Sequence, residues 1–390
     1  MAVAQLKRGE HHRTASGHPW VYRTEILGIN GRYEPGDVVD VVDFRGRFLG
    51  KGYVNPASQI TIRMLTRRDE RVDESFLRRR LEAACEYRRR TLDSRKSYRL
   101  VFGEADFLPG LIVDKFEDCL VVQTLALGID RWKGVIASIL EELVRPAGIY
   151  ERNDAPVRDL EGLERRTGFL AGSFDTRIVI GENGLRFVVD VENGQKTGHF
   201  LDQVENRRAI VGLASGRRVL DCFCYTGGFA VHAAAGGARE VEGIDVSEWA
   251  VGVARENARL NGVGDICRFV AGNAFDELRA RERSGERYDM IVLDPPAFAK
   301  SRASLEDAVR GYKEINLRAI RLLNPGGILV SCSCSRHLTE DLFFAVVQDA
   351  LLDSGRAGRV VEKRTQGRDH PYLVVAPEGY YLKCLILEID

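Results

Sequence analysis

Several features typical of specialised protein classes are missing from this sequence. It contains no apolar run of about 18 residues, so we expect no membrane-spanning helix. Its first eight residues lack the apolar stretch of a signal peptide, which predicts a cytoplasmic location. Internal repeats and low-complexity segments are absent as well. The 390 residues, 44 % hydrophobic and 29 % charged, instead predict an ordinary globular protein of two or three domains.

Cysteine patterns typical of metal sites are also missing. None of the eight cysteines forms a Cys-x-x-Cys pair, which argues against a zinc ribbon or a thioredoxin motif, and we expect no metal site. In a cytoplasmic chain of this size the thiols should be reduced. The sequence contains instead two Cys-x-Cys pairs, Cys222 with Cys224 and Cys332 with Cys334.

The chain has no net charge, with 57 basic and 57 acidic residues, but the two signs are distributed unevenly. Residues 1–100 contain 21 Lys and Arg against 13 Asp and Glu, whereas the remaining 290 residues contain 36 against 44. A polyanion is the natural partner of a basic half. The alternative is a solvated basic surface without a binding role.

The N-terminal 72 residues are predicted to form a small β-barrel. They are rich in short strand patterns and contain no helical pattern, and a barrel is the simplest closed arrangement of such strands. Strands are expected at residues 38–42, 48–54 and 59–65.

A helix is expected next, at residues 73–95. Its apolar face contains Leu77, Leu81, Ala84 and Cys85. Two arginine triplets, residues 78–80 and 88–90, lie mostly off that face. They form either a solvated face or a nucleic-acid surface, and in the second case Arg79 and Arg89 are candidate RNA contacts.

The remainder of the chain divides into two patterns. Residues 100–190 predict a compact α+β domain with strands at 111–114, 119–123, 149–151 and 186–190 and a helix at 132–143. From residue 191 strands and helices alternate, which predicts a doubly wound parallel sheet. Its strands are expected at 218–223, 240–245, 267–270, 289–294, 328–333 and 381–388, with helices such as 249–261 and 305–323.

A strand that leads through glycines into a helix contains the first candidate site. Residues 219–229 are Val-Leu-Asp-Cys-Phe-Cys-Tyr-Thr-Gly-Gly-Phe. A carboxylate at the strand end, Asp221, can accept a hydrogen bond from an ammonium group, and the glycines allow a ligand to approach the backbone. The spacing G-x-G-x-x-G is absent, which argues against NAD or FAD. An ordinary strand–helix turn is the alternative.

Polar residues also follow the next three strands. Asp245 lies 24 residues after the first carboxylate, where an acidic residue commonly binds ribose hydroxyls. Asn273 either contacts the adenine amino edge through its amide or is an ordinary turn residue. The fourth strand ends in Asp294-Pro295-Pro296. The prolines should form a rigid lip at the crevice where open α/β sheets bind ligands, and Asp294 should be a buried carboxylate facing the ligand.

The fifth strand ends in Ser333-Cys334-Ser335, beside the proline lip. A pyrimidine carbon is a poor nucleophile, and attack of a thiolate at the neighbouring ring carbon activates it. Cys334 stands where this nucleophile is needed. Cys332 shares its strand face and is interpreted as a packed or auxiliary thiol. The alternative is that both are core cysteines, since free cysteine is among the most buried residue types.

In this order and spacing, the motifs resemble the class I S-adenosylmethionine-dependent methyltransferases over residues 190–390. The resemblance implies S-adenosylmethionine as the cofactor. It implies that the methionine part is lined by Asp221, Phe223, Tyr225 and Gly227, the ribose bound by Asp245, and the adenine by Asn273 beside Ala274. It also implies that Asp294 faces the methyl group and the target base. Ser-Cys-Ser resembles the Thr-Cys-Ser segment of RNA cytosine-carbon-5 methyltransferases, which aligns Cys334 with their nucleophile.

The whole chain is similar to a narrower family. Residues 196–203, Lys-Thr-Gly-His-Phe-Leu-Asp-Gln, resemble the stretch before the catalytic domain of RlmI-type enzymes, which methylate a cytosine of large-subunit ribosomal RNA. Residues 108–114, 311–316 and 370–371 are similar too. The family implies an RNA-binding PUA barrel at 1–72, a linker helix with a β-β-α-β-β middle domain at 73–190, and a Rossmann-like catalytic domain at 191–390.

This resemblance implies RNA contacts and partners as well. The candidate RNA contacts, besides the two arginines above, are Lys196, Thr197, Phe200, Pro295 and Pro296. The expected partner is ribosomal RNA or the large ribosomal subunit, with no membrane, and a homodimer is left open.

The resulting hypothesis is a covalent mechanism. Cys334 attacks carbon 6 of a flipped-out cytosine, Asp294 hydrogen-bonds ring nitrogen 3 or the amino group, and carbon 5 takes the methyl group. Ala297 stands where many RNA cytosine methyltransferases have a second cysteine, so the base that removes the ring proton is unassigned. Asn273 stands where the wider superfamily often has Asp. Three rivals remain: a methyltransferase directed to guanine nitrogen 7, a non-catalytic RNA-binding or assembly factor, and a small-molecule methyltransferase.

Overall fold

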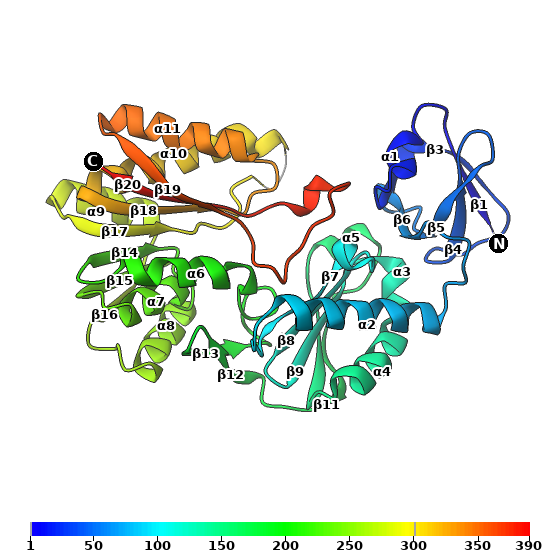
Figure 1. Cartoon of the computed structure of the whole chain (residues 1–390), viewed down its shortest axis with the longest axis horizontal. Helices are drawn as coiled ribbons and strands as arrows, with labels where there is room; N and C mark the ends of the chain where they lie inside the picture. Colours follow the sequence, from blue (N-terminus) through cyan, green and yellow to red (C-terminus); the bar gives the residue numbers. More distant parts are fainter. Residues whose placement is uncertain (1, 300–301) are drawn as a thin grey trace. The chain divides into compact units, whose positions relative to one another are not determined.

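The computed structural model describes residues 2–299 and 302–390, which form two compact units (Figure 1). The first unit contains Met1–Ile180, Val189–Leu201 and Arg368–Gly379. The second contains Gly181–Val188, Asp202–Gly367 and Tyr380–Asp390. Each unit is therefore built from segments that are distant in the chain. Among the described residues, no helix is long and apolar enough to cross a membrane.

The first unit begins with a six-stranded sheet of order β2-β6-β5-β4-β1-β3. The strands predicted around residues 38–66 are confirmed, and three further short strands precede them. Val39 and Val41 alternate with partly exposed neighbours and pack on Leu6 and Ile62, so one face of the sheet forms a small core. The elements are β1 (Val3–Leu6), α1 (His12–Ala15), β2 (Trp20–Tyr22), β3 (Ile26–Asn30), β4 (Val38–Val42), β5 (Phe48–Val54) and β6 (Ile60–Thr66).

The predicted helix and α+β domain follow in the same unit. Asp73 caps the predicted helix, α2, by accepting a hydrogen bond from the Phe76 N–H at 3.1 Å. The sheet has the order β11-β10-β9-β8-β7, and two of its strands, β7 and β11, were not predicted. The elements are α2 (Glu74–Thr91), β7 (Tyr98–Phe102), β8 (Leu111–Phe116), β9 (Cys119–Thr124), α3 (Leu127–Asp130), α4 (Lys133–Val144), β10 (Gly148–Asn153), α5 (Val157–Leu160) and β11 (Arg166–Gly172).

One part of the arginine prediction for α2 is wrong. Arg88 does not lie off the apolar face: it is 1 % exposed, pairs with Asp106, and donates to the carbonyls of Arg99 and Asp369 at 2.8 Å each. The apolar stripe Leu77, Leu81, Ala84 continues to this position at helical spacing. A buried guanidinium needs such partners, so Arg88 connects the helix to the returning C-terminal segment.

A two-stranded ribbon, β12 (Arg177–Glu182) with β13 (Leu185–Asp190), belongs partly to each unit. Its two-residue turn, Asn183-Gly184, has φ values of 51° and 85°, as the right-handed twist of a hairpin requires. The strand predicted at 186–190 is confirmed, but it pairs with β12 and not with the sheet of the middle domain.

The second unit is a seven-stranded sheet of order β16-β15-β14-β17-β18-β20-β19. All six predicted strands are present, and the five from β14 to β18 run parallel. The last two differ from the expected parallel sheet: β20 pairs antiparallel with β18 and β19, and β19 was not predicted. Most β19 residues are exposed, so this edge strand lacks an apolar pattern.

The elements of the second unit alternate as expected. They are α6 (Val204–Ile210), β14 (Arg218–Cys222), α7 (Gly228–Ala235), β15 (Glu240–Asp245), α8 (Glu248–Leu260), β16 (Cys267–Ala271), α9 (Ala274–Ser284), β17 (Tyr288–Leu293), α10 (Leu305–Leu322), β18 (Leu323–Ser333), α11 (Glu340–Ser354), β19 (Gly358–Arg364) and β20 (Lys383–Ile389).

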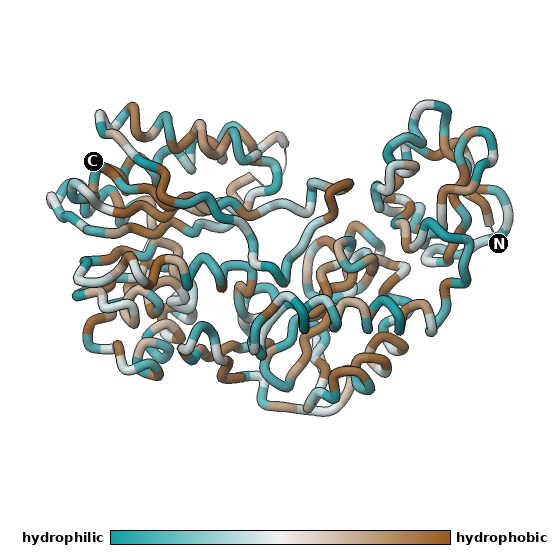
Figure 2. Tube along the Cα trace, in the orientation of Figure 1, coloured by the Kyte–Doolittle hydropathy of each residue, from teal (hydrophilic) through white to brown (hydrophobic). Residues whose placement is uncertain are grey.

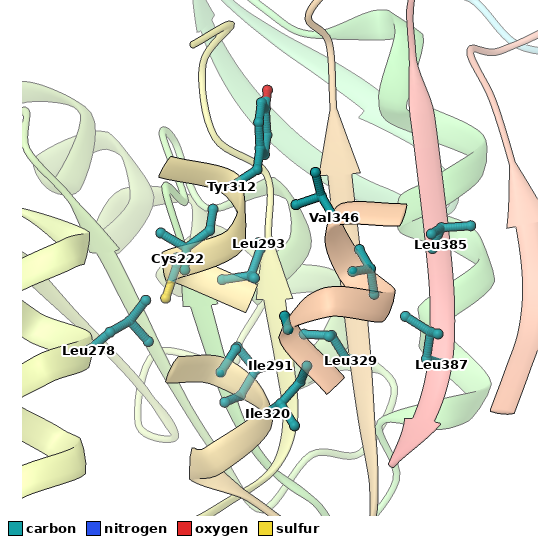
Figure 3. Packing of buried hydrophobic residues seen from close by; sticks show 14 of the residues in the cluster. Cys222, Leu278, Ile291, Leu293, Tyr312, Ile320, Leu329, Val346, Leu385 and Leu387 are labelled. Atoms are coloured by element: carbon teal, nitrogen blue, oxygen red, sulfur yellow. The ribbon is translucent and has the colours of Figure 1, made fainter. Parts of the chain in front are cut away.

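Hydrophobic residues follow the central strands of this sheet (Figure 2). Figure 3 shows Ile291 and Leu293 of β17 and Leu329 of β18 packed beside Ile320 of α10 and Val346 of α11, in one buried cluster. Central strands that are buried on both faces have continuous apolar sequences. The predicted site residues lie at the carboxyl ends of these strands.

Candidate active site

The sheet brings four predicted site residues to one edge. Asp221 is level with Gly243 of β15 and with Val292 of β17 in the parallel register. In the strand order, β15 and β16 follow β14 in one direction along the sheet, whereas β17 and β18 are added on the opposite side of β14. The crevice at such a switch in strand order is where open α/β sheets bind ligands. Asp221, Asp245, Asp294 and Cys334 all lie at or just beyond these strand ends.

Asp221 is the most deeply buried carboxylate of the site, 1 % exposed. Its Oδ2 accepts the Ala230 N–H of α7 at 2.9 Å, whereas its Oδ1 has no hydrogen-bond partner among the described residues. Burial raises the pKa of Asp221 well above its usual range, and the charges of Asp294 and Asp245 raise it further. An unsatisfied buried acceptor is costly. A ligand that brings a positively charged donor would therefore be stabilised here.

The turn after β14 has an unusual backbone. Phe223, Tyr225 and Gly227 have φ values of 64°, 48° and 80°. For the two non-glycine residues, a left-handed conformation costs on the order of 1–3 kcal/mol and is often retained at functional sites. A Cβ on Gly227 would lie 3.0 Å from Ala254 Cβ, so this position requires glycine for both conformation and space.

Asp245 fixes this turn. Its Oδ2 accepts the Tyr225 N–H and its Oδ1 accepts the Ser247 N–H, both at 2.9 Å. Each carboxylate oxygen has a second lone pair, so the hydroxyls of a ribose can still bind. Asp245 is half-buried, and the Tyr225 ring lies 6.1 Å from that of Trp249. The carboxylate therefore combines a structural role with an accessible acceptor.

Asn273 is a turn residue at the start of α9, the alternative to adenine binding that the sequence left open. Its side-chain oxygen accepts the Phe275 N–H at 2.9 Å and caps α9. The residue is exposed, and Ala274, the first residue of the helix, is buried. Capping explains the residue type without a ligand, so adenine binding by this amide stays a prediction.

Asp294 differs from the expectation of a buried carboxylate, because it is partly exposed. Its Oδ1 accepts a hydrogen bond from Gln203 Nε2 at 2.9 Å, and the Gln203 Oε1 accepts one from Asn206 at 2.6 Å. Asp294 directly follows β17 at the carboxyl edge of the sheet, so the carboxylate reaches solvent. Gln203 stood in a motif noted from the sequence, but that motif gave no sign of its contact with Asp294. Of the two lip prolines, Pro295 is buried and Pro296 exposed.

Cys334 is the partly exposed thiol at the end of β18. Its sulfur lies 3.8 Å from the carbonyl oxygen of Pro295, so the fifth strand end and the proline lip are in contact, as predicted. Cys332, in contrast, is fully buried opposite Cys384 of β20. The hydrogen bond with Cys384 and burial raise the pKa of Cys332 well above the usual thiol value. This agrees with a packed Cys332.

Lys383 is a site residue that the sequence analysis missed. It is 3 % exposed, and its ammonium donates to the carbonyls of Ser335 at 2.7 Å and Tyr381 at 2.8 Å. Burial lowers its pKa to about 8, although the negative charges of Cys334 and Glu340 oppose this shift. A lysine directly before the apolar residues 384–387 of β20 was the available signal.

The predicted RNA contacts at residues 196–200 lie in the first unit. Lys196 is exposed, and its ammonium lies 4.6 Å from the centre of the Phe200 ring. Thr197 is fully buried and donates to Asp114 Oδ2 at 2.6 Å, which argues against an RNA contact through its side chain. Of the two arginine candidates, Arg79 pairs with Glu70 at 3.0 Å and Arg89 with Glu86.

The residues at the carboxyl edge of the second unit fit S-adenosylmethionine. The unsatisfied Asp221 oxygen suits the ammonium of its methionine part, and the half-buried Asp245 suits its ribose. Gly227 keeps the turn between them free of a side chain.

Comparisons with known proteins agree with this fit. A family model described as S-adenosylmethionine-dependent methyltransferase matches residues 164–354, and a PUA-like domain model matches residues 4–67. A protein of Tolumonas auensis named ribosomal RNA large subunit methyltransferase I is 46 % identical over 95 % of both chains. A protein of the same name from Aeromonas salmonicida is 43 % identical over 98 % of both. An inferred methyltransferase from Streptococcus mutans has the same fold, with a TM-score of 0.86 and 19 % identity over the full length of both chains.

Proposed function

The chain belongs to the S-adenosylmethionine-dependent methyltransferase family whose members are named ribosomal RNA large subunit methyltransferase I, and on this premise we propose that it methylates carbon 5 of a cytosine in large-subunit ribosomal RNA. The names of the relatives support the RNA class. The observation that supports the atom is the partly exposed Cys334 thiol against the Asp294-Pro295 lip. Methylation of a guanine nitrogen needs no thiol at this position.

Cys334 acts as the nucleophile in this proposal. Its thiolate forms a bond to carbon 6 of the cytosine, and the electron pair of the carbon 5–carbon 6 double bond moves to carbon 5. S-adenosylmethionine, when bound, supplies an electrophilic methyl group. The electron pair at carbon 5 forms a bond to this methyl group as the bond from the methyl to the sulfonium sulfur breaks, and S-adenosylhomocysteine is the leaving group. A base then removes the carbon-5 proton, and the bond between the Cys334 sulfur and carbon 6 breaks to restore the thiolate and the double bond.

Asp294 recognises the same base. Its Oδ1 is oriented by Gln203, which is itself oriented by Asn206. A carboxylate held in this way can accept from the amino group of cytosine, or when protonated can donate to ring nitrogen 3. The target base must leave its helix, because carbons 5 and 6 are not accessible in a stacked duplex.

The test is to identify the product. The protein is incubated with labelled S-adenosylmethionine and unmodified large-subunit ribosomal RNA, and the RNA is digested to nucleosides for mass spectrometry. We expect labelled 5-methylcytidine. A labelled methylguanosine would leave the methyltransferase family in place and overturn the cysteine mechanism. An assembled large subunit tested in parallel shows whether free RNA or the particle is the better substrate.

A further inference from the structure

A cavity of about 360 Å³ lies in the first unit, between β6, the start of α2 and the segment around Phe107. Its volume is within the usual range of about 300–1,000 Å³ for ligand pockets. We call it the arginine cavity. Its polar and aromatic lining includes Arg67, Arg68, Glu70, Arg79, Arg80 and Phe107.

The cavity has an excess of positive charge. Four arginines and two glutamates line it. Glu70 is paired with Arg79 at 3.0 Å, and Glu104 with Arg63 at 3.4 Å. Within residues 2–299 and 302–390, no ion pair compensates Arg67, Arg68 or Arg80. Three guanidinium groups therefore line the cavity without an ion pair to the described residues, and four arginines outnumber two glutamates there, an arrangement that favours an anionic ligand.

Arg80 is the most constrained of these three cations. Its guanidinium carbon lies 5.0 Å from the centres of both the Phe76 and the Phe107 rings, and one N–H donates to the Leu65 carbonyl at 3.3 Å. Burial lowers the pKa of Arg80, the neighbouring charges of Arg79 and Arg68 lower it further, and only Glu70 opposes them. A bound anion would remove this electrostatic cost.

Phe107 provides an aromatic surface next to these charges. Its side chain is 49 % exposed, and its backbone has a φ of 57°, a conformation that is uncommon outside glycine and that holds the ring at the cavity. Large exposed aromatic rings beside arginines are the usual platform for unstacked bases. A simple inorganic anion would use the charges but not the ring.

We propose that the arginine cavity binds a phosphodiester of RNA through Arg67, Arg68 and Arg80, with an unpaired base stacked on Phe107. The inference rests on the proposed function, since it takes the RNA substrate as the ligand. It assigns to the first unit a local site that holds a single-stranded segment.

The experiment measures RNA binding by the full chain. A fluorescent single-stranded fragment of large-subunit ribosomal RNA is titrated at several salt concentrations, with wild type and the variants Arg80→Gln, Arg68→Gln and Phe107→Ala. Arg166→Gln is the matched control, because Arg166 is exposed, belongs to the same unit and pairs with Glu164 away from the cavity.

Each arginine variant should weaken binding by about 3- to 10-fold and reduce the slope of log K against log salt by about 1. Phe107→Ala should weaken binding by about 5-fold or more and leave the slope unchanged, because base stacking is not ionic. The control should bind as wild type does.

The results separate the two proposals. Wild-type affinity in both Arg68→Gln and Phe107→Ala would overturn the cavity site, and because both side chains are exposed, misfolding would not explain a loss. An equal loss of RNA affinity in the control Arg166→Gln would also overturn the cavity site. Neither result bears on the proposed methylation, which the nucleoside analysis tests by itself.

Discussion

Two Cys-x-Cys pairs stand at the carboxyl ends of two parallel strands of one sheet, β14 and β18, which are separated by β17, yet their surroundings differ. Residues 223–227 connect β14 to α7 through a turn in which Phe223 and Tyr225 have left-handed backbones, and both Cys222 and Cys224 are buried, at 0 % and 6 % exposure. Residues 334–339, all of them described, connect β18 to α11 without a positive φ, and Cys334 remains partly exposed while Cys332 is buried. Equal spacing in the sequence therefore does not define a nucleophile. The course of the chain after the strand decides which thiol is accessible.

The strongest test of this contrast is Cys334→Ala. We expect methyl transfer to ribosomal RNA to fall by at least about 10³-fold, because the nucleophile is lost. Binding of S-adenosylmethionine, measured by calorimetry, should stay within about twofold, because the sulfur contacts the Pro295 carbonyl and the substitution leaves Asp221 and Asp245 in place. Retained turnover in this variant would contradict the covalent mechanism.

Asp221→Asn tests the other strand end. The substitution removes the negative charge while keeping an acceptor for the Ala230 N–H. A charge-assisted hydrogen bond contributes about 1.5–3 kcal/mol, so the dissociation constant of S-adenosylmethionine should rise by about 10- to 100-fold. Calorimetry measures it, with thermal unfolding as the control for folding. Unchanged affinity would place the ammonium of the cofactor elsewhere.

Lys383→Met tests whether the ammonium of Lys383 contributes to the difference in reactivity between Cys334 and the buried cysteines. Lys383 has a pKa of about 8, so below that pH its ammonium is charged and stabilises a negative charge on Cys334. Without it, the Cys334 thiol should ionise at higher pH, and alkylation by iodoacetamide at pH 7 should be about 3- to 10-fold slower. Peptide mass spectrometry follows Cys334 across a pH series. Lys313→Met, which removes a cation paired with Asp353, is the control and should leave the profile unchanged.

Cys224→Ala should have the smallest effect on chemistry. Burial raises the pKa of Cys224 well above the usual thiol value, so it does not serve as a nucleophile at neutral pH. We expect methyl transfer within about twofold of wild type and a loss of about 1 kcal/mol in the free energy of unfolding from the small cavity. Activity as low as that of Cys334→Ala would refute the distinction drawn between the two strand ends.

Much of the second unit was predictable, because the positions of its candidate site residues follow from the local alternation of strands and helices. Asp221, Asp245 and Asp294 each lie at the carboxyl end of a strand in a β-α alternation, and such strand ends meet at one edge. The antiparallel β20 and the exposed β19 were not predicted as such, because strand direction depends on pairing and an edge strand has no apolar signature. The roles of the arginines in the first unit were less predictable, because the sequence alone does not show which arginine is buried in an ion pair and which one is accessible.

The sequence by itself determined the fold class, the family and the positions of the strand-end residues. The tertiary structure decided which of these residues are accessible and what holds them. Gln203 reaches Asp294 across 91 positions of the chain, and Lys383 reaches the carbonyl of Ser335 across 48. It also decided that Arg88 is a buried structural cation while Arg80 lines a cavity. The reason is physical: a residue type follows from local pattern, but burial and pairing depend on which distant segments pack together.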